Sequence, residues 1–218
     1  MCEICDKTYD EKTIELSCCR NVTEIPLLPE LEILYCAYTK ITEIPVLPKL
    51  QRLHCYNTKI TEIPLLTKLK YLYCDNTKIT EIPVLPELVY LNCSYTNITE
   101  MPVLPKLKEL NCAYTKITEI PFLPELEILW CSNTKITEIP VLPKLGYLVC
   151  CYTKITAFPK MPNCYIDAGN CVWLNPAADR INKLGKLQKW IRYIIDKRTK
   201  IIHAAMHTYR DLVYVLNV

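Results

Sequence analysis

The sequence has little glycine, no long apolar run and no recognisable catalytic motif. Its 218 residues include only 3 glycines, and it carries no nucleotide-binding loop, serine elbow or paired acid/base constellation. No apolar stretch approaches the roughly 20 residues that a membrane helix needs. The N-terminal stretch, MCEICDKTYDEK, is polar and acidic, unlike a secretory signal. We therefore expect a non-enzymatic protein without a cofactor, located in a cytoplasm.

The overall composition is that of an ordinary globular protein. Hydrophobic residues make up 50% of the chain and charged residues 22%, both near the usual values. Of the 16 prolines, all but Pro176 lie between Pro26 and Pro162. Because these prolines recur at regular positions, they belong to a repeat architecture and not to a linker.

A unit of 19 residues dominates the chain and reads LxxLxCxxTxIxxIPxLPx. Its cysteine stands at Cys36, Cys55, Cys74, Cys93, Cys112, Cys131 and Cys150. A leucine precedes each of these cysteines by two residues, and a threonine follows each by three. One such unit cannot bury its own apolar face, so a period of this length indicates a solenoid.

The unit resembles a leucine-rich repeat. The core motif of that family, LxxLxLxxNxL, corresponds here to LxxLxCxxTxI, which recurs from about Ser17 to Pro162. The IPxLP ending is similar to the short repeats of bacterial effectors. The combination of cysteine, threonine and lysine resembles repeat proteins of giant viruses that infect amoebae. This resemblance implies an α/β solenoid: a leucine-rich repeat arc with a concave parallel β-sheet and an extended, polyproline-like convex side. It also implies a viral protein acting in a host cell. Threonine replaces the asparagine that bonds backbone between turns, and its hydroxyl is expected to do the same work.

Three segments follow from the pattern. Residues 1–17 are a lead-in, in which Thr13–Leu16 alternates like a strand. Residues 18–162 form the solenoid, about eight repeats with a strand in each, near Arg52–His54 in one of them. Residues 163–218 form a helical C-terminal cap, after a last degenerate strand in Cys164–Asp167. The residues of one unit expected to point inward are Leu50, Leu53, Cys55, Ile60, Ile63 and Leu66.

Aromatic side chains are expected to gather on the concave face, beside the central leucines. We predict that they bind a protein partner, because tyrosine and tryptophan dominate binding hot spots. Stacking of the rings on one another, as a purely structural feature, is the alternative. We expect no small-molecule substrate, no nucleic acid or membrane, and a monomer or homodimer. The predicted partner-binding residues are Tyr35, His54, Tyr71, Tyr73, Tyr90, Tyr95, Tyr114, Trp130 and Tyr147, with Tyr38, Tyr56 and Tyr152 at equivalent positions.

A basic segment near the C-terminus offers a second site. Residues 175–218 contain 9 basic and 3 acidic residues, and their apolar residues recur at helical spacing. Such a helix could make the protein an adaptor for a calmodulin-like protein, an anionic membrane or nucleic acid. The alternative is that it only caps the solenoid. The residues of this site are Lys183, Lys186, Gln188, Lys189, Arg192, Lys197 and Arg198.

The remaining cysteines and the charges complete the predictions. The cysteines of the repeat are expected to be buried thiols. Cys2 and Cys5 have the spacing of half a zinc site, but no second such pair follows nearby, so we predict no metal site. Whether these two, or Cys164 and Cys171, bind metal or form disulfides stays open. A column of lysines that includes Lys59 and a column of glutamates that includes Glu62 are expected to offset each other on a solvated face.

Overall fold

The computed structural model describes residues 2–169 and 171. These residues belong to the first of two compact units, which divide at residue 174. Of the helical cap predicted for residues 163–218, only 163–169 and 171 are described, and the expected helices and the basic segment at 183–198 lie outside the described residues. Within the described part of the chain, no helix has both the length and the apolar character needed to cross a membrane.

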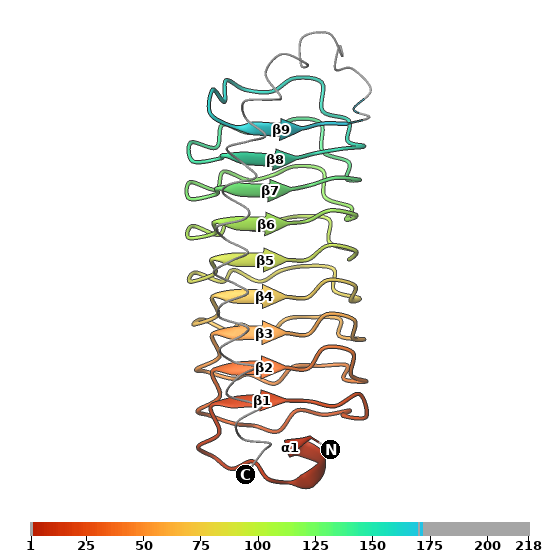
Figure 1. The fold of residues 1–218 in the computed structure, drawn as a ribbon, viewed down its shortest axis with the longest axis vertical. Coiled ribbons are helices and arrows are strands. Elements are labelled where there is room, and N and C mark those ends of the chain that lie inside the picture. Colours follow the sequence, from red (N-terminus) through yellow and green to blue (C-terminus); the bar gives the residue numbers. More distant parts are fainter. Residues whose placement is uncertain (1, 170, 172–218) are drawn as a thin grey trace, which may run out of the picture. The chain divides into compact units, whose positions relative to one another are not determined.

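The unit is built around one parallel sheet of nine strands that lie in sequence order, as Figure 1 shows. Each strand has three residues, with its central residue in register with that of the next strand. The strands are β1 (Glu15–Ser17), β2 (Ile33–Tyr35), β3 (Arg52–His54), β4 (Tyr71–Tyr73), β5 (Tyr90–Asn92), β6 (Glu109–Asn111), β7 (Ile128–Trp130), β8 (Tyr147–Val149) and β9 (Tyr165–Asp167). The predicted solenoid is confirmed, and its strand at Arg52–His54 is placed correctly. The lead-in strand begins two residues later than predicted.

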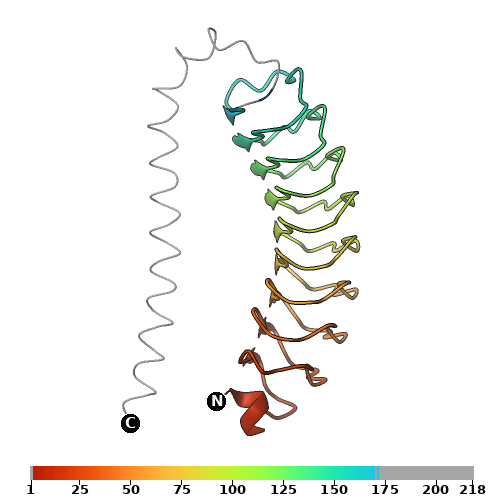
Figure 2. The same ribbon diagram turned by 90° about the vertical axis from the view of Figure 1, so that its right-hand side faces the viewer.

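The strands occupy one side of the coil and the proline-containing connections return along the other (Figure 2). The proline-containing segments, such as residues 44–48, form neither strand nor helix, because proline fixes φ and has no N–H to donate. A short turn then leads to the next strand, closed in one repeat by the Leu50 N–H on the Leu47 carbonyl at 3.1 Å. A 19-residue unit therefore forms one flat turn of the solenoid.

The core is a stack of identical layers between the sheet and these connections. The predicted inward residues of the example unit are all buried, from Leu50, Leu53, Cys55 and Ile60 at 0% exposure to Ile63 at 6%. The seven repeat cysteines have no exposed surface, which confirms that they pack as small apolar groups. Burial raises the pKa of the Cys112 thiol to about 12, so these thiols stay protonated and unreactive.

The threonine that replaces the family's asparagine works differently from our prediction. The Thr58 hydroxyl donates to the Cys55 carbonyl of its own turn at 2.6 Å, and Thr96 does the same to Cys93. The hydroxyl reaches back three residues because the chain bends sharply after each strand. Backbone groups make the bonds between turns instead, for example the Cys36 N–H to the His54 carbonyl at 2.8 Å.

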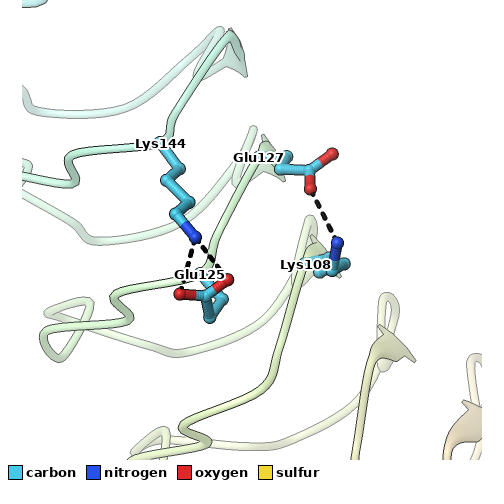
Figure 3. A network of polar contacts seen from close by, with 4 residues as sticks. All are labelled: Lys108, Glu125, Glu127 and Lys144. Atoms are coloured by element: carbon cyan, nitrogen blue, oxygen red, sulfur yellow. Dashed lines mark hydrogen bonds and ion pairs between the residues drawn. The ribbon is translucent and has the colours of Figure 1, made fainter.

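Lysine and glutamate pair at positions other than those predicted. The ion pairs of the described residues include Lys49–Glu30, Lys106–Glu87, Lys144–Glu125 and Lys108–Glu127, of which Figure 3 shows the last two. Equivalent residues of adjacent turns lie one strand spacing apart, about 4.8 Å. Where one repeat position carries lysine in one turn and glutamate in the next, the two side chains can form an ion pair across the turns. The column of Lys59 and the column of Glu62 carry the same charge in successive turns, so their members cannot pair within their own column. These pairs are partly exposed, so each contributes little.

The N-terminal segment adds one short helix, α1 (Glu3–Asp6). It ends at Lys7, which takes the left-handed conformation with φ 53° and donates its N–H to the carbonyls of Glu3 and Ile4. The segment then reaches β1, the edge strand of the sheet. Side chains of Cys2, Ile4 and Tyr9 pack against the first turn of the core.

Candidate functional site

The candidate site is the outer face of the parallel sheet. In each three-residue strand the central residue points into the core, so the residues on either side of it point away. In β3, Arg52 and His54 are half-buried beside the fully buried Leu53. The same pattern in the neighbouring strands brings the predicted aromatic residues to this face.

Four rings form a continuous stack across β2 to β5. Ring centroids are 4.7 Å apart for Tyr35 and His54, 4.2 Å for His54 and Tyr73, and 4.6 Å for Tyr73 and Tyr90. The residues before and after the central leucines form two separate columns along the sheet. Tyr73 belongs to the column after the leucines and Tyr90 to the column before them, so their contact joins the two columns. Beside it, the Arg52 guanidinium lies 4.8 Å from the centre of the Tyr71 ring, a cation–π contact. We call Tyr35, His54, Tyr71, Tyr73 and Tyr90 the N-terminal aromatic patch.

A second, smaller group lies on β7 to β9. The Trp130 ring meets the Tyr147 ring edge-on with centroids 6.1 Å apart, and Tyr147 stacks on Tyr165 at 5.3 Å. Tyr147 is buried, whereas we predicted that it faces solvent. Sequence reasoning did not identify Tyr165, which follows Tyr147 by 18 residues and so falls outside the 19-residue period.

Polar residues separate these two groups. Asn92 and Asn111 occupy successive strands between Tyr73 and Trp130. The Asn92 amide donates to the Asp75 carboxylate at 2.9 Å, and its oxygen accepts from the Ser94 hydroxyl at 2.8 Å. The predicted single aromatic surface is therefore divided, and Trp130 does not adjoin Tyr90.

More exposed tyrosines lie in the turns that follow the strands. Tyr95 and Tyr114 stack with centroids 4.3 Å apart, and both are about half exposed, at 57% and 47%. Each has a positive φ, 56° and 57°, a conformation that is uncommon for a bulky side chain. Their N–H groups donate to carbonyls of the next turn, which holds the backbone in place. The near absence of glycine leaves these positions to tyrosine and asparagine.

His54 is the electrostatically unusual member of the N-terminal aromatic patch. Its burial, together with the nearby Arg52, lowers the pKa from 6.5 to about 4. Its Nε2 atom is buried and has no hydrogen-bond partner among the described residues. Burial also raises the pKa values of Tyr73 and Tyr90. The rings of the patch are therefore uncharged at neutral pH and partly buried, with the positive charge of Arg52 at one side and the carboxylate of Glu109 beside Tyr90.

The neutral state of His54 predicts a pH dependence of stability. Its folded pKa of about 4 lies below the ordinary 6.5, so the unfolded chain binds more protons between these values and the protein loses stability as pH falls through that range. His54→Phe keeps a flat ring between Tyr35 and Tyr73 and removes the titration. We expect the melting temperature of the wild type to fall more from pH 7 to pH 5 than that of the variant. Equal falls would contradict the assignment.

A feature that sequence reasoning missed is a column of exposed apolar side chains, each at the residue that follows the first proline of a repeat. These residues recur every 19 positions, so the repeat contained the information needed to predict the column. We call it the exposed apolar column. Its members are Leu27, Val46, Leu65, Val84, Val103, Phe122 and Val141.

The sequence did not decide whether Cys164 and Cys171 form a disulfide. Cys164 and Cys171 are both buried, and no disulfide joins them in the part of the chain that the structure describes. The Cys171 thiol donates to the Cys150 carbonyl at 3.1 Å and contacts the Thr153 hydroxyl at 3.3 Å. These contacts continue the hydrogen bonding of the last turns, so they indicate a structural role.

Comparisons with known proteins agree with this architecture. A family model described as leucine-rich repeats in two copies matches residues 48–87 and 86–125. No curated protein matches the sequence.

Three solved structures share the fold. YopM, a leucine-rich effector protein from Yersinia pestis, is 24% identical with a TM-score of 0.68, over 77% of this chain and 51% of that one. YopM from Yersinia enterocolitica WA-314 is 24% identical with a TM-score of 0.55, over 71% and 39%. The leucine-rich repeat domain of a Shigella effector is 24% identical with a TM-score of 0.59, over 71% and 74%. The chain thus spans about half or less of the two Yersinia proteins. The repeats in residues 48–125 match the leucine-rich repeat model, and the described residues share the parallel-strand solenoid fold of these leucine-rich repeat structures.

Proposed function

We propose that this protein binds a protein partner through the N-terminal aromatic patch on the outer face of its sheet. Leucine-rich repeats and effector-like structural neighbours support a protein-interaction module in general. The observation that carries the finer proposal is the stack Tyr35–His54–Tyr73–Tyr90 with Tyr71 and Arg52 beside it. These residues lie on four neighbouring strands and so present one surface.

The physical state of the patch favours binding over purely structural stacking. His54 and Tyr73 are each held between two neighbouring rings, so these two side chains lose little entropy when a partner docks. The rings remain partly exposed, and a cluster of partly exposed aromatic residues is typical of interaction sites.

The class of partner follows by analogy. The neighbouring structures from Yersinia and Shigella are effectors by name. We propose that this chain likewise binds a protein of a host cell or of its own virus, without catalysing a reaction. The viral origin rests on the resemblance of the repeats to those of giant viruses, and a cytoplasmic location would follow from it.

A capture experiment from a host cytosolic extract tests the site. The double variant Tyr35→Ala/Tyr73→Ala should lose the captured partner, since it removes two of the stacked rings. The control Val84→Ala/Val103→Ala trims the exposed apolar column and should retain the partner. The variant Lys189→Glu/Arg192→Glu reverses charge in the basic segment and should also retain it. Loss of the partner in the charge-reversal variant alone would contradict the proposal and favour the adaptor function.

A further inference from the structure

Three cysteines meet at the N-terminal end of the solenoid. Cys2 precedes α1, Cys5 lies within it, and Cys19 follows β1 by two residues. Their sulfur atoms are 3.6 Å apart for Cys2 and Cys5 and 3.4 Å for Cys5 and Cys19, and all three lie within 4.8 Å of one another. In residues 2–169 and 171, no other group of three cysteine, histidine or carboxylate ligands is brought so close.

These distances match a metal site better than a disulfide. A tetrahedral zinc ion with Zn–S bonds of about 2.3 Å places its sulfur ligands about 3.8 Å apart. A disulfide requires about 2.05 Å and uses only two of the three thiols. We propose that Cys2, Cys5 and Cys19 together hold one thiophilic metal ion, zinc by the type and number of its ligands. Three protein ligands leave the fourth tetrahedral position to water.

The surrounding backbone supports this arrangement. The left-handed turn at Lys7 returns the chain after α1. The adjacent Cys18 is not among the three cysteines whose sulfur atoms lie within 4.8 Å of one another, and its N–H joins the sheet at the Tyr35 carbonyl as those of the repeat cysteines do. It therefore continues the cysteine column and is not a ligand.

The position of the cluster indicates what the ion would do. A solenoid needs a cap over each open end, and β1 is the exposed edge of the sheet. The ion would close the loop from Cys5 to Cys19 and fix residues 2–7 over the first turn. Sequence reasoning set a zinc site aside because Cys2 and Cys5 had no second pair nearby. The structure supplies the third ligand from the other side of β1.

The test uses the full-length chain, reduced and stripped of metal, and titrated with zinc ion alone. We expect one zinc per chain. Bound zinc should block alkylation of Cys2, Cys5 and Cys19, and a chelator should restore it, as measured by mass spectrometry. The buried cysteines from Cys36 to Cys150 should stay unlabelled in both states, which also reports that the protein remains folded. Cobalt in place of zinc should show the absorption of a thiolate-bound tetrahedral ion.

Matched variants make the test specific. Cys5→Ser and Cys19→Ser each remove a proposed ligand and should weaken zinc binding by at least about 100-fold. Cys18→Ser changes the neighbouring residue and should leave the affinity unchanged. Absence of bound zinc, free alkylation of the three cysteines in its presence, or affinity that survives Cys19→Ser would overturn the proposal. A disulfide within the cluster as the stable state under cytosolic glutathione conditions would overturn it as well.

Discussion

Leu66→Ala is expected to lower the free energy of unfolding by about 2–5 kcal/mol, the usual range for a buried leucine. Leu65→Ala, at the preceding residue, should change it by no more than about 0.5 kcal/mol. The two leucines are adjacent in sequence, but Leu66 is 1% exposed and Leu65 is 59% exposed. The first change leaves a cavity between stacked layers, whereas the second removes a side chain that is already largely in water.

Urea denaturation followed by circular dichroism measures both effects on the same chain. Each turn of a solenoid contacts only its neighbours, so a cavity in one turn also weakens its contacts with the two adjacent turns. The matched pair keeps chemistry and location constant and varies burial alone. Equal losses in the two variants, or a larger loss for Leu65→Ala, would contradict the direction of the side chains in the segment that follows Ile63-Pro64.

The repeat made most of the fold predictable. A strict 19-residue period fixes the register of neighbouring strands, so the strand at Arg52–His54 and its inward Leu53 follow from the sequence. The buried cysteine column follows in the same way, since Cys55 stands two residues after that leucine. The last strand, β9, was recognisable from Cys164–Asp167 although its repeat is shorter.

Features that depend on local geometry were not predictable. The Thr58 hydroxyl bonds within its own turn because of how sharply the chain bends, which the pattern does not state. The contact of Tyr73 with Tyr90 depends on side-chain directions across two columns. The N-terminal segment lies outside the repeat, so no period indicated that Cys19 lies beside Cys2 and Cys5.

Tyr73→Ala is expected to have the largest effect on binding. Tyr73 lies between His54 and Tyr90 and so joins the two halves of the N-terminal aromatic patch. Hot-spot residues near the centre of an interface cost about 2 kcal/mol or more when cut to alanine, which is roughly a 30-fold loss of affinity. Loss of its two ring contacts also costs the fold about 0.5–1.5 kcal/mol each. Circular dichroism must therefore show that the variant remains folded.

The affinity of the purified captured partner for three single variants, measured by isothermal titration calorimetry, tests the proposed site most directly. Tyr73→Phe keeps the stacked ring, and Val84→Ala trims the exposed apolar column. We predict that Tyr73→Ala binds roughly 30-fold or more weakly than the wild type, while the other two stay within about threefold. Unchanged affinity of Tyr73→Ala together with weakened binding by Val84→Ala would contradict the aromatic face as the site and indicate the exposed apolar column instead.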